Sequence, residues 1–318
     1  MSYRGRLAVM SLVACTALVG LASRGVRAAD HSDMPQNVLN EIIVRPDASI
    51  TDFWAFVEGR DLVMIMGLNP LLSPEVTRYE FPSDVRYTFH VDNDSRVRID
   101  DSVISREFGG VIEDASAIEE DIAFEITFTK KRGRPRLEVR GARRLGARLF
   151  AGLRAEAFIF APFVRNNIAG IVVQVPLRRV VGRQPELILW ATAEVDAPNG
   201  PFVDLGGRAL RSQFGPSLEL NALDPSEHLA AGFDPADVVI LDTSLPTTFP
   251  NGRFLEDDVV DIVAGFVSLP TDGNAAAGEV ANCSEGGNFF PCPVEPSATA
   301  DDIRIQRRFP YLGRPYRP

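Results

Sequence analysis

The sequence predicts a mainly β protein, with an antiparallel β-sandwich-like core and a few short peripheral helices. Apolar residues occupy every second position in Val85–Asp92 and again in Phe124–Phe128. That period is typical of a strand with one buried face. Two further runs, Ile168–Val175 and Leu187–Val195, are almost continuously apolar, as in strands covered on both faces. Short polar turns between such segments favour antiparallel pairing.

Two β-hairpins are predicted from these turns. The basic turn Lys130–Pro135 follows the second alternating segment, and alternation resumes at Leu137–Val139. Nearer the N-terminus, Phe53–Val57 and Leu62–Met66 flank a three-residue turn centred on glycine. Turn residues between two alternating runs are the usual sign of a hairpin.

Helices are predicted only in the second half of the chain. A helix capped by Asp224 should run to Ala231 and end at Gly232, since proline follows the cap and glutamate occupies the third helical position. The segment Leu255–Ser268 has apolar residues at spacings of three and four, which predicts an amphipathic helix. Acidic residues in its first turns suit the positive end of the helix dipole; they are Asp257, Asp258 and Asp261.

Composition limits the function classes. The chain has 318 residues, of which 45% are hydrophobic and 24% charged, with three cysteines and three histidines. It is long enough for one large domain and has an ordinary globular composition. A formal net charge of −10 disfavours a nucleic-acid partner. So few cysteines and histidines exclude a disulfide-dense scaffold and a Cys/His zinc framework, and motifs of nucleophilic or nucleotide-binding enzymes are missing from the sequence.

The first 28 residues are predicted to be a signal peptide. Arg4 and Arg6 precede the apolar run Leu7–Ala22, and small residues at the −3 and −1 positions allow cleavage after Ala28. The protein is therefore expected to be exported to the periplasm or the extracellular space, without a transmembrane domain in the mature chain. Residues 29–318 are expected to form a single β-rich domain with an irregular C-terminal segment, 269–318. An alternative is a lipobox that leaves a lipid-anchored Cys15.

Removal of the signal peptide changes charge and cysteine count. The mature chain would keep 29 basic residues against 43 acidic ones, a formal net charge of −14. Its two cysteines, Cys283 and Cys292, flank a short segment with a Gly-Gly pair. In an oxidising compartment they are expected to form a disulfide, worth about 2–3 kcal/mol by loop entropy. The alternative is two free thiols.

One candidate cation site is the loop that follows the first alternating strand. Alternating Asp and Asn side chains can direct several oxygens at a hard cation such as calcium. The loop lacks the glycine and glutamate positions of an EF-hand. The alternative is an Asx-type turn with solvated aspartates. The loop carries Asp92, Asn93, Asp94, Asp100 and Asp101.

A second candidate is a divalent transition-metal site near the mature N-terminus. His31 and Asp33 occur there, and Asp52 precedes an aromatic strand. Imidazole with two carboxylates suits such metals. His90 lies on the polar side of its strand by alternation and is a candidate for either cluster. The alternative for the terminal residues is a solvated arm or a salt-bridged cap.

Two basic segments interrupt an otherwise acidic chain. They are Lys130–Arg134 and Arg140–Arg148. The simpler interpretation is charged hairpin ends in solvent. The alternative is contact with anionic lipid or polysaccharide.

Eight short segments occur in a characteristic order along the chain. They are Asp30–Pro35, Ile50–Phe56, His90–Asp94, Phe150–Arg154, Ile171–Pro176, Pro250–Arg253, Asp257–Asp261 and Phe309–Leu312. In this order they resemble an exported bacterial and archaeal family known as domain of unknown function 4331. The resemblance implies a strand-rich exported protein and carries no assigned activity. Two departures weaken any cation site of the family here: Ser95 and Arg96 follow Asp94 where glycine and an acid are expected, and alanines flank Glu156.

These observations favour a non-enzymatic exported protein that binds a divalent cation or an envelope partner, either a protein or a polysaccharide. The alternative is a metal-dependent enzyme with a His/Asp centre built from His31, Asp33 and Asp52, joined by His90. A third hypothesis is assembly through exposed strand edges.

Overall fold

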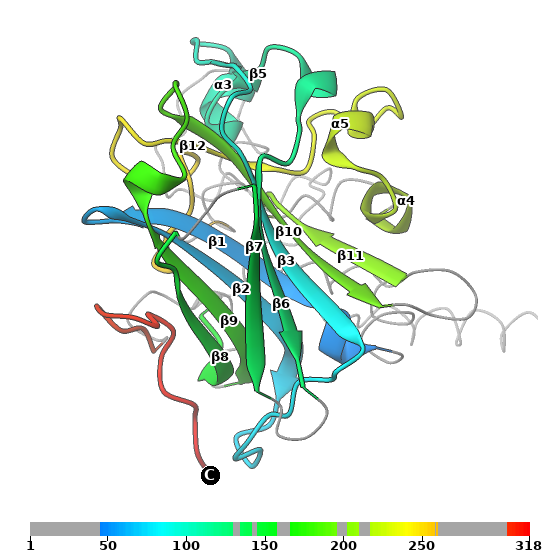
Figure 1. Ribbon diagram of the computed structural model, residues 1–318, viewed down its shortest axis with the longest axis vertical. Coiled ribbons are helices and arrows are strands. Elements are labelled where there is room, and N and C mark those ends of the chain that lie inside the picture. Colours follow the sequence, from blue (N-terminus) through cyan, green and yellow to red (C-terminus); the bar gives the residue numbers. More distant parts are fainter. Residues whose placement is uncertain are drawn as a thin grey trace, which may run out of the picture.

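The computed structural model describes residues 45–129, 134–141, 145–157, 166–195, 202–209, 217–257, 259 and 304–318. Two antiparallel sheets pack face to face in this part of the chain, and short helices lie at the periphery (Figure 1). The predicted fold class is confirmed. The predicted signal peptide, His31, Asp33, Cys283 and Cys292 lie outside the described residues.

The first sheet has four strands and contains the predicted N-terminal hairpin. Strands β1 and β2 pair from Phe53 with Met66 to Glu58 with Asp61, and Gly59 adopts a φ of +64° in the turn between them. Glycine reaches this left-handed region without steric cost. The strand order is β1 (Ile50–Glu58), β2 (Asp61–Leu72), β9 (Asn167–Pro176), β8 (Arg148–Ala155).

The second sheet has six strands and contains the predicted hairpin of β6 and β7, which pair from Ala123 with Arg140 to Phe128 with Pro135. The first alternating segment forms β3, which lies between β10 and β6. The strand order is β11 (Phe202–Gly206), β10 (Glu186–Val195), β3 (Val85–Asp92), β6 (Ile122–Phe128), β7 (Pro135–Arg140), and β12 (Val239–Asp242) also pairs with β10.

The main hydrophobic core lies between the two sheets. The rings of Phe53 on β1 and Phe89 on β3 approach to 6.1 Å between centroids across it. As predicted, β9 and β10 are buried along almost their whole length. Both are covered on their outer sides as well, because two further clusters pack there.

One outer cluster covers the four-stranded sheet. Trp54 and Phe56 of β1 pack there against Tyr311 and Leu312 of the segment 304–318. Gly170 on β9 makes room for this segment, since a Cβ at that position would lie 2.5 Å from Leu312 Cδ1. Figure 1 shows the segment in red beside β8.

The other outer cluster covers the six-stranded sheet. Trp190 and Ile188 of β10 pack with Leu205 of β11 and with side chains from two connecting segments, among them Ile118 and Val238. The outer face of this sheet is therefore largely closed to solvent around β10.

Short elements complete the described fold. A two-stranded sheet joins β4 (Val97–Arg98) to β5 (Val111–Ile112). The α-helices are α3 (Val103–Phe108), α4 (Ser217–Asn221) and α5 (Pro225–His228), and the 3-10 helices are η2 (Pro46–Ala48), η3 (Ala115–Ala117) and η4 (Leu177–Arg179). None of the helices within the described ranges is long and apolar enough to cross a membrane.

The predicted capping of α5 is confirmed, because Asp224 and Glu227 form a capping box. The helix ends at His228 and not at Ala231, and the chain continues as a turn to Gly232, which has a φ of +90°. The backbone hydrogen bonds account for the early end, because Gly232 N donates to Leu229 O at 3.0 Å and Phe233 N donates to His228 O at 2.8 Å, as where a helix closes on a left-handed glycine. The buried His228 ring lies between Leu220 O and the backbone N–H of residue 237.

The start of the predicted helix 255–268 differs from expectation. Leu255 lies in a turn, and residue 259 is helical. The Asp257 carboxylate accepts hydrogen bonds from Phe254 N (2.7 Å) and Phe249 N (3.3 Å). This aspartate therefore stabilises the preceding loop through two hydrogen bonds, in addition to any favourable interaction with the helix dipole. The rest of that helix lies outside the described residues.

Candidate functional site

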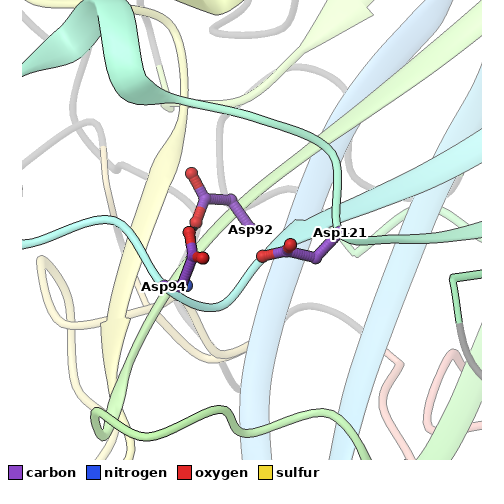
Figure 2. Close-up of side chains that lie close together, drawn as sticks. All are labelled: Asp92, Asp94 and Asp121. Carbon is purple, nitrogen blue, oxygen red and sulfur yellow. Dashed lines mark hydrogen bonds between the residues drawn. The ribbon is translucent and has the colours of Figure 1, made fainter.

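Three aspartates converge at one end of the six-stranded sheet. Asp92 ends β3, Asp94 follows in the loop, and Asp121 immediately precedes β6 (Figure 2). One carboxylate oxygen from each lies within 4.8 Å of the other two. The convergence follows from antiparallel pairing, which places the end of β3 beside the start of β6, with Val91 opposite Ile122. The sequence predicted Asp92 and Asp94 but missed Asp121.

Asp92 is the buried member of the cluster and holds the loop in shape. It is 1% exposed. Its Oδ1 accepts from Asp94 N at 3.1 Å and Ser95 N at 2.9 Å. Its Oδ2 accepts from Ser95 Oγ at 2.5 Å and Glu119 N at 3.1 Å. Four donors fill the acceptor positions of a carboxylate, so Asp92 forms the Asx-type turn and has little capacity left for a cation.

Asp121 and Asp94 retain free oxygen positions. Asp121 is half-buried and its Oδ2 accepts from Asn93 N at 2.8 Å. Burial raises the pKa of Asp121, and the charges of Asp94, Asp92 and Glu119 raise it further, against the lowering effect of the Asn93 hydrogen bond. Asp94 is exposed. A cation between these carboxylates would relieve their mutual repulsion.

Arg96 does not neutralise the three aspartates. In the described part of the chain it forms no ion pair with the three aspartates. The positive charge that the sequence places in this loop therefore does not occupy the position of a cation.

The remaining acids of the predicted loop serve a different purpose. Asp100 accepts from Ser102 N at 2.8 Å, just ahead of α3. Hydrogen bonds from Ser102 and Ser105, with the charge of Arg98, lower the pKa of Asp100 to about 2. Neither Asp100 nor Asp101 belongs to the cluster of three.

His90 is buried on the outer side of the six-stranded sheet, with 8% of its surface exposed. Nδ1 lies 2.5 Å from Glu120 Oε2, and Nε2 lies 2.9 Å from Thr192 Oγ1. The ring stacks on Trp190 at 4.9 Å with 4° between planes. Since both ring nitrogens are engaged, His90 could bind a metal only by giving up one of these contacts.

Glu120 is the carboxylate partner of this histidine. The hydrogen bond from His90 lowers the pKa of Glu120, and the charges of His90 and Arg140 add to this effect against burial. An ionised carboxylate can only accept, so Nδ1 carries the proton that is shared with it. The arrangement is that of a satisfied buried histidine.

Asp52 is paired on the other side of the molecule. Its Oδ1 lies 2.6 Å from Arg253 Nη2, and the two side chains are 1% and 3% exposed. Arg253 also lies over the Trp54 ring, with 5.0 Å from Cζ to the ring centroid. Trp54 is on the outer side of the four-stranded sheet, whereas His90 is on the outer side of the other sheet. The structure does not bring Asp52 and His90 together, and a metal centre at Asp52 would have to displace Arg253.

The fold and this cluster define an antiparallel two-sheet β protein with an acidic loop at one sheet end. Comparisons with protein families, with curated proteins and with solved structures found no match for the chain. The resemblance to domain of unknown function 4331 therefore stays a prediction.

Proposed function

We propose that this protein is an exported, non-enzymatic β-sandwich protein that binds a divalent cation, with calcium as the first candidate, and contacts a partner in the cell envelope. The observation that carries the cation part is that carboxylate oxygens of Asp94 and Asp121 lie within 4.8 Å of each other, beside the hydrogen-bonded carboxylate of Asp92. The apolar N-terminal run and the family resemblance support export, which N-terminal sequencing of protein recovered from the periplasm or medium would test.

Asp94 and Asp121 would supply the protein ligands, and Asp92 would hold them in place. Calcium takes six to eight oxygen ligands and accepts water among them. Two carboxylates with water completing the shell make a weak site, so we expect a dissociation constant of about 10⁻⁴–10⁻³ M, as in extracellular calcium modules. Such a site would be filled only where calcium is abundant.

Calorimetric titration with calcium, and separately with zinc, tests the site directly. The double variant Asp94→Asn and Asp121→Asn should lose the binding heat, because each replacement removes a charged ligand while keeping the shape. Glu75→Gln is the control, since Glu75 is exposed and outside the cluster. No heat from the unchanged protein up to millimolar calcium, or equal heat from the double variant, would refute the cation site.

A further inference from the structure

A stripe of arginines lies along the free edge of the four-stranded sheet. β8 is the edge strand and contributes Arg148 and Arg154. The segment 304–318 contributes five more arginines and, like β8, contains no acidic residue. We call this set the arginine stripe; its members are Arg148, Arg154, Arg304, Arg307, Arg308, Arg314 and Arg317.

The stripe is elongated because the segment 304–318 runs beside β8. At one end, the Arg148 guanidinium lies 4.2 Å from the centroid of the Phe309 ring. At the other end, Ala155 N donates to Gly313 O at 3.2 Å. β8 has eight residues, so the stripe extends for about 25 Å at the usual rise of a strand. Figure 1 shows the two segments side by side.

The seven arginines of the stripe form no ion pair within the described part of the chain. Arg148 donates to the neutral Gln174 Oε1 at 3.1 Å, and Gln174 Nε2 donates to Asp61 Oδ2 at 2.7 Å, so Asp61 is linked to Arg148 through an amide and not directly. Arg154 Nε is buried and has no hydrogen-bond acceptor among the described residues. Burial and the nearby charge of Arg314 lower the pKa of Arg154. An anion beside Arg154 and Arg314 would supply the missing acceptor and offset their repulsion.

Three of the guanidinium groups are held on aromatic rings. Besides Arg148 on Phe309, Arg154 lies 4.0 Å from the Phe150 centroid and Arg304 lies 4.4 Å from the Tyr316 centroid. A stacked guanidinium keeps its N–H edge free to donate in two parallel bonds to a carboxylate, sulfate or phosphate. Because the side chains are already ordered, binding costs less conformational entropy.

We propose that the arginine stripe binds a linear acidic polysaccharide through carboxylate or sulfate groups repeated along its length. The length of the stripe suits a linear polymer. A membrane is disfavoured, since the large exposed apolar residues of the described chain are Ile99, Leu229 and Leu245, and none belongs to the stripe. Nucleic acid is disfavoured by the formal net charge of −10 of the whole chain. The proposal rests on the export part of the proposed function and is independent of the cation site.

The test measures binding of fluorescently labelled heparin and polygalacturonate, with neutral dextran as the reference, in chelator and at low ionic strength. The double variant Arg154→Gln and Arg314→Gln should bind at least about tenfold more weakly, since charge-assisted hydrogen bonds are the strong ones. The matched control is Arg78→Gln with Arg98→Gln, which removes the same charge from two exposed arginines that are already paired with acids. Circular dichroism verifies that each variant is folded.

Three results would overturn the proposal. They are no binding of either polysaccharide by the unchanged protein, equal weakening in the control, and tighter binding of phosphatidylglycerol vesicles or single-stranded DNA than of polysaccharide. Calcium is absent from these measurements, so failure of the cation site would not affect them. Recovery of the protein only from the cytosol would refute export while leaving the binding result unchanged.

Discussion

The buried ion pair between Asp52 and Arg253 gives the sharpest stability prediction. The two side chains are 1% and 3% exposed and 2.6 Å apart, so removal of either charge breaks this ion pair while the other charge stays buried. Such a loss costs about 3–5 kcal/mol. We therefore expect Arg253→Met to lower the free energy of unfolding by that amount, with a small part from lost stacking on Trp54.

Urea denaturation followed by tryptophan fluorescence measures this loss as a lower midpoint at an unchanged slope. In a thermal scan, the same loss corresponds to a fall of roughly 6–20 °C for a domain of 150–250 residues. The control is Glu80→Gln, which breaks the exposed pair with Arg78 and should cost less than about 1 kcal/mol.

A double variant distinguishes loss of the ion pair from the other effects of replacing Arg253. Asp52→Asn combined with Arg253→Met removes both charges and should be more stable than Arg253→Met alone, because no isolated charge stays buried. If Arg253→Met changes stability no more than Glu80→Gln does, the reasoning that these charges depend on each other is refuted.

Three other predictions follow from the contacts above. The pKa of Asp121 is raised in the folded state, so its contribution to stability is greatest at acid pH and is lost as pH rises through the folded-state pKa. As pH rises from about 4 to about 7, the stability of Asp121→Asn should therefore increase relative to that of the unchanged protein. An equal difference in stability at the two pH values would contradict this. The pKa of Glu120 is lowered by His90, so its stabilisation is present at neutral pH and is lost as pH falls below about 4; Glu120→Gln should cost about 1–3 kcal/mol at pH 7 and less at acid pH in urea titrations. Gly170→Ala should lower the free energy of unfolding by about 1–3 kcal/mol because the new methyl group meets Leu312 Cδ1 at 2.5 Å. The double variant with Leu312→Ala should lose less stability than the sum of the two single losses, because the shortened side chain relieves the clash. If the two changes in melting temperature simply add, the contact is refuted.

Strand positions were largely predictable from the sequence because burial of one or both faces of a strand determines which of its positions are apolar. Val85–Asp92 was predicted with the bounds that the structure shows. The Asx-type turn at Asp92 was also foreseen as an alternative, and four hydrogen bonds to that carboxylate form such a turn. The expectation that its aspartates face water is wrong for Asp92, which is 1% exposed.

The partners of the candidate residues were harder to predict, because they come from distant parts of the chain. Asp52 pairs with Arg253, about 200 residues away, and no local pattern signals such a contact. Alternation placed His90 away from the main core correctly, but it could not show that Trp190 and Ile118 close the outer face. Asp121 was within reach of prediction, since pairing Val85–Asp92 with the next alternating strand places it beside Asp92.

The outer cover of the four-stranded sheet has a consequence for folding order. Trp54 and Phe56 come from β1, whereas Tyr311 and Leu312, which cover them, are made some 250 residues later. Until the segment 304–318 arrives, a growing chain leaves an aromatic surface open to water, and contacts of such long sequence separation form slowly. A chain that is cut short before this segment would therefore keep the outer face of β1 partly uncovered, which favours aggregation over completion of the native state.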